Sequence, residues 1–326
     1  MRIFTFKGLF FTAVFMLLGC LSIQAADDDL ITKQITIKLD EAGTLPDRIA
    51  KSKIYKITNL KLVGEINGTD LRMIREMAGR DYSGYFTDGK LSVLDLSEAM
   101  IVEGGLLYYS DYSCYTTNNE IGKFAFKGCS GLTSLTLPAN IKWIGASAFY
   151  GCSGLTSLPL PANIEWIGAS AFSGCSGLTS LTLPSSITTI SESAFSGCSG
   201  LTSLTLPSNI TEIGEWAFSN CSGLASIYVY AEKVPKMAED VFKGCDATKC
   251  ILYVPKGTYD DYFISNFGYF ENIEEFEVTG IGKPTTSTDA KELSRYSVNG
   301  QRLVGPTKGL NIVKYSDGSV KKVVVQ

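Results

Sequence analysis

Cysteine is the residue type in this 326-residue sequence with the widest range of possible chemistry. Six of the nine cysteines recur at a nearly constant spacing, namely Cys129, Cys152, Cys175, Cys198, Cys221 and Cys245. Strands lie about 4.8 Å apart, but in-register side chains keep their Cβ atoms further apart than the ~3.8 Å typical of a disulfide. A line of thiols also offers no tetrahedral cluster for zinc. We therefore expect reduced, buried packing residues.

Other possibilities are open where the cysteine spacing is irregular. Cys245 and Cys250 lie where the spacing loosens, so both a disulfide between them and two free thiols are open. Cys114 has no obvious partner, and Cys20 lies close to the N-terminus.

The sequence contains no histidine. This excludes Ser-His and Cys-His nucleophile pairs and removes the commonest zinc ligand. Asp260-Asp261 and Glu274-Glu275 could be paired catalytic carboxylates, but adjacent side chains point in different directions and suit a solvated surface. The net charge of −4 disfavours nucleic acid as a partner. We expect no catalytic residue, no cofactor and no metal, so an enzyme, for example a carboxylate-dependent hydrolase, is the weakest hypothesis.

Seven aromatic residues are candidates for ligand contact. Trp143 and Trp166 occupy the same position in adjacent repeats and should protrude side by side, and Trp216 stands where other repeats have serine. An insertion over residues 104–119 adds Tyr108, Tyr109, Tyr112 and Tyr115. Exposed aromatic side chains are favoured at binding hot spots, and tyrosine supplies rigid contact area on loops. Local packing over the turns is the alternative.

A repeat of about 23 residues positions these side chains. Its unit reads I-G-x-x-A-F-x-G-C-S-G-L-T-S-L-T-L-P, and its phenylalanine returns at Phe126, Phe149, Phe172, Phe195, Phe218 and Phe242. The pattern L-x-x-L-x-L predicts a short strand with leucines inward and Ser and Thr outward, followed by turns or 3₁₀ pieces. Stacked units share one core. The fold class is therefore an α/β-type repeat solenoid dominated by short parallel strands.

The outward face of these strands carries a ladder of hydroxyl side chains, such as Ser180 and Thr182. This ladder is either a soluble surface or an uncharged binding surface. Seven charged side chains occur between Ile121 and Tyr230, so we expect no strong electrostatic steering there. Pro159 breaks the Ser-x-Thr pattern and removes one sheet hydrogen bond.

The unit A-F-x-G-C-S-G-L-T-S-L-T-L-P resembles the BspA-like class of leucine-rich repeats over about residues 121–256. The flanking segments 67–79 and 94–97 are similar to it as well. Members of this class are generally surface-exposed, and several are regarded as adhesins for host matrix proteins or other cells. The resemblance implies an adhesin-like module that binds an extracellular protein or glycan. A passive surface scaffold is the alternative, and we expect a monomer.

The N-terminus predicts export. Arg2 and Lys7 precede an apolar stretch from Gly8 to Ile23, and small residues lead to Ala25 and Ala26. These are the three parts of a signal peptide, and a membrane anchor would need about 20 apolar residues. We expect an extracellular or cell-surface protein cleaved after Ala25 or Ala26. Leu17-Leu18-Gly19-Cys20 resembles a lipobox, so an outer-membrane lipoprotein lipidated at Cys20 is the alternative, and membrane contact is expected only in that case.

The remaining segments flank the solenoid. In the N-terminal cap, Asp70 to Met77 is predicted as a helix with Thr69 or Asp70 as N-cap, and Ile251 to Val254 is predicted as the last strand of the stack. The tail has Asn-Gly and Asp-Gly hairpin signals and resembles the C-terminal sorting domain of the type IX secretion route, with a simple terminal β module as the alternative.

Five parts of the chain are therefore expected. They are a signal peptide over 1–25, an N-terminal cap with irregular leucine-rich repeats over 26–120, a solenoid with its C-terminal cap over 121–278, a linker over 279–292 and a small all-β module over 293–326.

Overall fold

The computed structural model describes residues 30–278, 292–297, 302–303, 309–315 and 320–325. The chain divides into two compact units after Phe276. The predicted signal peptide, Cys20 and residues 279–291 of the predicted linker lie outside the described residues. Within the described segments, no helix is both long and apolar enough to cross a membrane.

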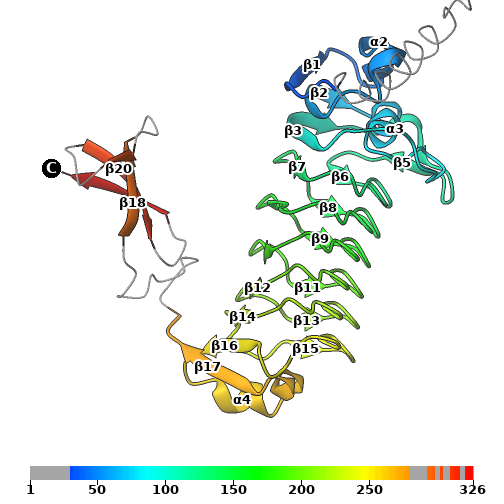
Figure 1. Ribbon diagram of the computed structural model, residues 1–326. Coiled ribbons are helices and arrows are strands. Elements are labelled where there is room, and N and C mark those ends of the chain that lie inside the picture. Colours follow the sequence, from blue (N-terminus) through cyan, green and yellow to red (C-terminus); the bar gives the residue numbers. More distant parts are fainter. Residues whose placement is uncertain (1–29, 279–291, 298–301, 304–308, 316–319, 326) are drawn as a thin grey trace, which may run out of the picture. The chain divides into compact units, whose positions relative to one another are not determined.

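The first unit is a stack of repeats, which confirms the predicted solenoid (Figure 1). Its main sheet is parallel and consists of two parts. The first part is β1 (Ile35–Leu39), β2 (Asn59–Ile66), β3 (Val93–Ile101) and β7 (Ser134–Thr136), and the second is β10 (Ser180–Thr182), β12 (Ser203–Leu206), β14 (Ser226–Val229), β16 (Ile251–Pro255) and β17 (Asn272–Phe276). Leu181 pairs in register with Leu204, and Leu204 with Ile227. All three side chains are buried, as the L-x-x-L-x-L pattern predicts.

The return side of the repeats forms two short parallel sheets of three strands each, which the sequence pattern did not predict and which we together call the return ladder. Its strands have two residues each: β6 (Glu120–Ile121), β8 (Trp143–Ile144), β9 (Trp166–Ile167), β11 (Thr189–Ile190), β13 (Glu212–Ile213) and β15 (Lys236–Met237). In five of these strands the isoleucine is buried beside a partly or fully exposed neighbour, and in β15 the partly buried Met237 takes its place. Strands this short carry too few residues for an alternating pattern to be recognised.

Between the two ladders, the repeat loops join their neighbours through main-chain hydrogen bonds. The N–H groups of Ser147, Phe149 and Gly151 donate to carbonyls of the next repeat, at 2.9, 2.7 and 2.8 Å. Three equivalent bonds recur at each of the other junctions between Phe124 and Lys243. We call this set of bonds the loop ladder.

A column of phenylalanine rings lies beneath the loop ladder. Consecutive ring centroids are 5.1–5.6 Å apart and consecutive ring planes differ by 1–12° from Phe126 through Phe242. All six rings are buried. Parallel-displaced aromatic rings at this spacing add to the free energy gained from burying their area.

The N-terminal cap holds α2 (Leu45–Arg48), the 3₁₀ helix η1 (Lys51–Lys53) and α3 (Gly68–Met77). The predicted N-cap of α3 is wrong, because the N-cap is Asn67. Its side chain accepts a hydrogen bond from the Thr69 N–H, and the Asp70 carboxylate accepts one from the Asn67 N–H. Asp70 therefore lies inside a capping box, at its third helical position. The same carboxylate accepts from the N–H groups of Gly43 and Leu45 and fixes the preceding loop.

Side chains of this cap close the N-terminal end of the loop ladder. The buried Arg75 donates to the carbonyls of Phe124 and Ala125, at 2.8 and 2.9 Å. Arg80 donates to the Gly128 carbonyl at 2.9 Å. The Ala125 carbonyl, which in later repeats would accept from the repeat before it, is therefore paired with Arg75.

The C-terminal end carries one more rung than the sequence analysis predicted. Ile251 to Val254 is not the last strand, because β17 pairs with β16 in parallel and Ile273 lies in register with Leu252. The short helix α4 (Tyr259–Phe263) and the 3₁₀ helix η2 (Asn266–Tyr269) connect these two strands. The rings of Phe267 and Phe270 cover the last ring of the column, that of Phe242.

The second unit contains a four-stranded antiparallel sheet in the order β19-β18-β20-β21, which confirms the predicted all-β module. Its strands are β18 (Glu292–Ser297), β19 (Arg302–Leu303), β20 (Gly309–Tyr315) and β21 (Val320–Val325).

The inward and outward positions of the main sheet can be tested at one strand. Leu181→Ala should lower the free energy of unfolding by about 2–5 kcal/mol, because it leaves a cavity in the core. Thr182→Ala, at the exposed neighbouring residue, should change it by no more than about 0.5 kcal/mol. Urea denaturation of both variants measures the difference. Equal losses would show that the two faces of the strand are assigned the wrong way round.

Candidate interaction surface

The two tryptophans of adjacent repeats lie side by side on the return ladder. Trp143 and Trp166 are partners in the β8–β9 register, and they are 39% and 42% exposed. Ile144 and Ile167 anchor the same strands in the core. The preceding residues of the two strands, Lys142 and Glu165, form an ion pair of 2.9 Å. The two adjacent repeats therefore hold both indole rings side by side on the surface.

The insertion over 104–119 is a hairpin of β4 (Gly104–Tyr109) and β5 (Cys114–Thr116). Tyr108 and Tyr109 are 1% and 4% exposed, so they are not available to a ligand, and their prediction as contact residues is wrong. The Tyr108 hydroxyl donates to the Lys123 carbonyl at 3.0 Å, and the Tyr109 ring lies 5.1 Å from that of Phe124. These two tyrosines attach the hairpin to the first repeat.

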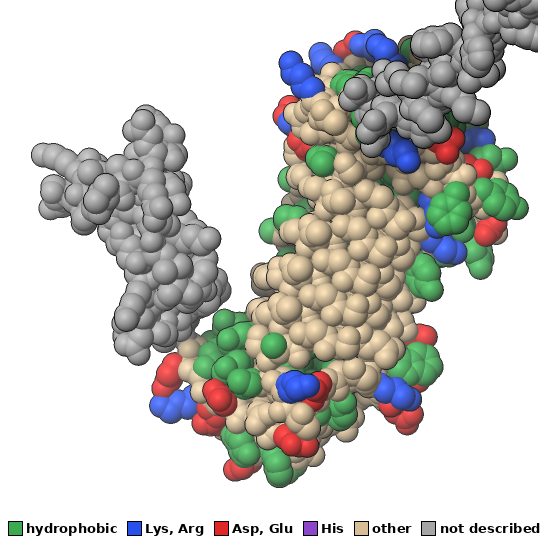
Figure 2. Space-filling model, viewed as in Figure 1, with side chains coloured by type: hydrophobic (Ala, Val, Ile, Leu, Met, Phe, Trp, Pro, Cys, Tyr) green, Lys and Arg blue, Asp and Glu red, His purple; other side chains and the backbone are tan. Residues whose placement is uncertain are grey.

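The other two tyrosines of the hairpin are exposed. Tyr112 and Tyr115 are 68% and 52% exposed, and Tyr112 also stacks on Phe124 at 4.9 Å. Figure 2 shows hydrophobic side chains gathered at this end of the solenoid, whereas the middle of the same face is largely free of charged and hydrophobic side chains.

A loop of the N-terminal cap extends this exposed area. The Ser110 N–H of the hairpin donates to the Tyr82 carbonyl at 2.9 Å, which joins the hairpin to the loop. Tyr85 and Phe86 of the loop are exposed, and the Arg80 guanidinium lies 3.5 Å from the Phe86 ring centroid. The sequence analysis missed both residues, although two adjacent aromatics after Gly84 were a visible signal. We define the hairpin surface as the exposed side chains of Tyr85, Phe86, Leu106, Tyr112 and Tyr115.

Trp216 is exposed at a position where the backbone is left-handed. Its φ is 54°, and the equivalent serines Ser147, Ser170 and Ser193 have φ of 53–55°. The Trp216 indole N–H donates to the Asp240 carboxylate at 3.4 Å. A bulky residue in this conformation costs on the order of 1 kcal/mol, so the neighbouring bonds of the loop ladder must hold it there.

The outer face of the main sheet is interrupted at Pro159. Ser157 forms an isolated bridge with Ser134, and the described residues form no strand of the main sheet between β7 and β10. The two parts of the main sheet therefore separate at this proline, which lacks the N–H group that a continuous ladder needs. A shallow hollow of about 420 Å³ lies there, lined by Pro159, Ser180 and Pro184 among others.

Aromatic side chains replace the hydroxyl ladder at the C-terminal end of the same face. Tyr228 and Tyr253 stack at 4.5 Å, and the Phe276 ring lies edge-on to Tyr228 at 6.1 Å. Tyr228 was visible as a break in the Ser-x-Thr pattern. Tyr253 and Phe276 were missed because their rungs depart from the 23-residue spacing.

The cysteine column is buried, as predicted. Each thiol after Cys129 donates to the carbonyl of the phenylalanine one repeat earlier, for example Cys152 to Phe126 at 3.0 Å and Cys175 to Phe149 at 3.1 Å. Every cysteine of the described residues is a free thiol, including Cys245 and Cys250. Burial raises the pKa of Cys175 from 9.0 to about 12, so this thiol is neutral and unreactive at physiological pH.

The acidic pairs contribute structure at the C-terminal end. The Glu275 carboxylate accepts hydrogen bonds from the N–H groups of Gly257 and Tyr259, at 2.8 and 3.0 Å. Asp260 and Asp261 lie in the first turn of α4, where the helix dipole stabilises negatively charged side chains. Among the described residues, no group of three or more Cys, Asp or Glu side chains is arranged to hold a metal ion.

Comparison with known proteins places the repeats in a class. Residues 119–249 match the family model described as the BspA type leucine rich repeat region, in six copies. The repeat region is of the BspA type. The stacked leucines, the phenylalanine column and the cysteine column described above all lie within these copies or at their edges.

Several solved structures are similar to this BspA-type solenoid, although no curated protein matches the chain. A leucine-rich repeat protein of T. pallidum is 27% identical over 41% of this chain and 66% of that chain, with a TM-score of 0.33. A leucine rich cell surface protein of Faecalibacterium prausnitzii is 19% identical over 68% and 51%, with a TM-score of 0.34. The pneumococcal vaccine antigen PcpA is 18% identical over 68% and 57%, with a TM-score of 0.43. This chain spans less than two thirds of the length of each.

The raised thiol pKa predicts alkaline destabilisation. Between pH 9 and 12 the unfolded chain loses the Cys175 proton and the folded chain keeps it, so stability is lost as the pH rises through this window. Each such thiol lowers the free energy of unfolding by up to about 1.4 kcal/mol per pH unit. Cys175→Ala should therefore show a shallower decline between pH 9 and 11 than the parent chain in urea titrations. An unchanged slope would contradict the burial of this thiol.

Proposed function

We propose that this chain is an exported, cell-surface leucine-rich repeat protein that acts as an adhesin-like binding module for an extracellular protein or glycan. The observation that supports this most is the exposure of aromatic side chains at a few defined places on an otherwise uniform stack. Trp143 and Trp166 are held in register on the return ladder, and Tyr112 and Tyr115 project from an anchored hairpin.

Specificity should come from the places where the repeats differ. The hydroxyl ladder offers the same chemistry at each rung, such as Ser180 and Ser203, and therefore does not define a unique site. Large aromatic side chains dominate the energetics of binding when a partner covers them. The tryptophan pair and the hairpin surface are the two sites with this property in the N-terminal half of the stack.

The hairpin surface is organised before any partner binds. The Leu106 N–H donates to the Thr69 hydroxyl at 3.0 Å, and Tyr108 and Tyr109 fix the end of the same strand, β4, to the first repeat. A partner therefore meets a preformed surface and loses little free energy in ordering it. Such preorganisation favours a binding role over that of a passive scaffold, which has no need of it.

Export is part of the same proposal. Residues 1–26 supply the expected signal peptide, and lipidation of Cys20 would instead anchor the chain to an outer membrane. The tail over 293–326 is proposed as a sorting module on the strength of its sequence pattern. Mass spectrometry of the mature chain distinguishes an N-terminus at Ala26 or Asp27 from a lipidated Cys20.

Binding is predicted to depend on the exposed aromatics and little on ionic strength. A panel of extracellular-matrix proteins and glycans is screened against the mature chain, and a ligand that binds is measured with two double variants, Trp143→Ala/Trp166→Ala and Tyr112→Ala/Tyr115→Ala. At least one should lose about 2 kcal/mol or more of binding free energy. Added salt should weaken binding only slightly, because the middle of the repeat region is nearly uncharged.

The control is Ser180→Ala/Thr182→Ala on the outer sheet face, which should bind as the parent does. Tyr108 and Tyr109 are left intact because their burial makes any loss on replacement ambiguous. Parent-like affinity in both aromatic variants would rule out the aromatic sites. A panel without any ligand would favour the passive scaffold instead.

A further inference from the structure

The loop ladder ends at the last repeat with its donors facing an open edge. By the repeat register, Asp240, Phe242 and Gly244 correspond to Trp216, Phe218 and Asn220, which donate to the carbonyls of Glu239, Val241 and Lys243. No acceptor among the described residues pairs with the N–H groups of these three residues. Because each earlier repeat directs these donors toward the following repeat, they face the C-terminal side here.

The two ends of the loop ladder are therefore different. At the N-terminal end, Tyr108 and Arg75 donate to the Lys123 and Ala125 carbonyls, two of the three that would otherwise be open. At the C-terminal end, no side chain of the described residues does the same for the open donors. Unpaired main-chain donors on an edge are a template for pairing with another chain.

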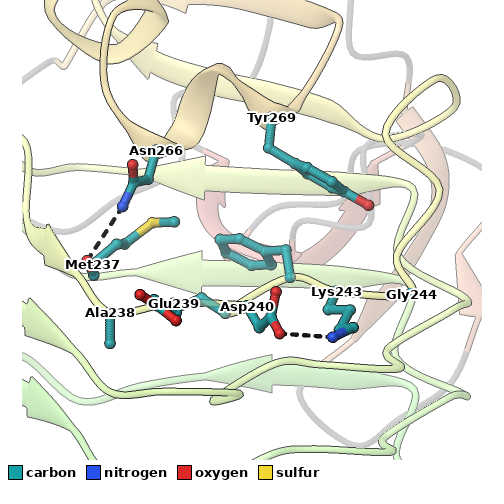
Figure 3. A pocket seen from close by; sticks show the side chains of 10 residues that line it. Met237, Ala238, Glu239, Asp240, Lys243, Gly244, Asn266 and Tyr269 are labelled. Carbon is teal, nitrogen blue, oxygen red and sulfur yellow. Dashed lines mark hydrogen bonds and ion pairs between the residues drawn. The ribbon is translucent and has the colours of Figure 1, made fainter.

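A hollow lies where the next repeat loop would be. It has a volume of about 440 Å³ and lies between residues 237–244 and the 3₁₀ helix η2 (Figure 3). Asn266 and Tyr269 of η2 also line it, but both use their polar groups elsewhere. Asn266 donates to the Met237 carbonyl at 3.3 Å, and the Tyr269 hydroxyl donates to the Cys245 carbonyl at 2.8 Å. The helix η2 thus forms a wall of the hollow and leaves the open donors uncapped.

The spacing of the donors indicates what fits the hollow. At the junction before the last one, Ser193, Phe195 and Gly197 donate to the carbonyls of alternate residues, Glu215, Ala217 and Ser219. These acceptors lie in a turn that contains the left-handed Trp216, so the complement of the three donors is a second chain whose carbonyls on alternate residues are held in the turn conformation of a repeat loop.

The charges at the rim disfavour a free anion. Glu239 and Asp240 carry carboxylates there, and Lys243, the one cation among the described residues that line the hollow, is paired with Asp240 at 2.7 Å. The hydrogen bond from Lys243 also lowers the pKa of the Asp240 carboxyl, so this group is ionised at neutral pH. Glu239 is exposed and faces the same hollow, which favours a ligand with a basic side chain.

We infer that the open edge at Asp240, Phe242 and Gly244 binds a peptide segment of a partner protein in the turn conformation of a repeat loop, whose main-chain carbonyls accept from these N–H groups and whose Lys or Arg side chain pairs with Glu239. End-to-end stacking of a second copy does not fit, because the Lys123 and Ala125 carbonyls of its first repeat already accept from Tyr108 and Arg75. This site is separate from the tryptophan pair and the hairpin surface, so the inference does not depend on the proposed function and is tested independently of it.

The first test is amide hydrogen exchange of the full chain. The N–H groups of Asp240, Phe242 and Gly244 should exchange on the order of a hundredfold faster than those of Ser193, Phe195 and Gly197, which occupy the same positions inside the stack. Equal protection of the two sets, without any added peptide, would show that another part of the chain already covers the edge and would overturn the inference.

The second test uses a display library of random twelve-residue peptides as the probe. Peptides enriched on the full chain should contain Lys or Arg and should slow exchange at the three open amides. Asn266→Trp, which places a large ring at the hollow from an exposed position, should weaken their binding by about tenfold or more. Glu239→Lys should weaken it similarly by reversing the charge at the rim.

Glu192→Lys is the matched control, because Glu192 occupies the position of Glu239 in a repeat whose neighbouring donors are already paired. It should leave peptide binding unchanged. Three results would overturn the inference. The first is a library that yields no enrichment on the parent chain over the Asn266→Trp chain, and the second is a set of enriched peptides that bind the parent and the Asn266→Trp chain equally. The third is enrichment of acidic peptides that the Glu239→Lys chain binds more tightly than the parent.

Discussion

Each repeat of this protein depends on its neighbours for both its apolar packing and its main-chain hydrogen bonds. The rings of Phe149 and Phe172 stack at 5.1 Å, and the Phe149 N–H donates to the Ala171 carbonyl of the same neighbouring repeat. A repeat taken alone would expose its phenylalanine ring to water and leave its main-chain N–H and C=O groups without partners. The free energy lost in this way is far larger than the free energy that a single contact provides. The stack is therefore stable only as a whole, and its two ends need special treatment.

The same dependence explains several small residues that have no chemical role. A Cβ on Gly177 would lie 2.5 Å from the Ser153 carbonyl oxygen, so only glycine allows the two loops to approach this closely. The buried thiol of Cys175 fits beside that loop and donates to the Phe149 carbonyl. Cysteine serves here as a small apolar residue with one weak donor, and its regular spacing follows from the spacing of the rungs.

The regular part of the fold could be predicted from the sequence because its unit recurs almost without change. Leucine spacing indicates which side chains face inward, and the structure buries Leu181 and Leu204 as expected. The irregular ends were less predictable. β17 does not follow the repeat spacing, and the N-cap role of Asn67 depends on a reciprocal bond with Asp70 that pattern alone does not show.

The candidate surface could be predicted only in part. The position of Trp143 and Trp166 within the repeat correctly indicated that both side chains are exposed. The hairpin has no repeat to compare with, so its buried Tyr108 and exposed Tyr112 look alike in the sequence.

The uniformity of the junctions has a geometric consequence. The hairpin surface is attached to the first repeat and the open donors belong to the last, and identical junctions separate them. Each added or deleted repeat would change the distance between these two sites by about one strand spacing, roughly 4.8 Å, and would leave both sites chemically intact. The number of repeats therefore sets the distance between the two contact points. Duplication or deletion of repeats in the gene would change this distance in steps of one unit.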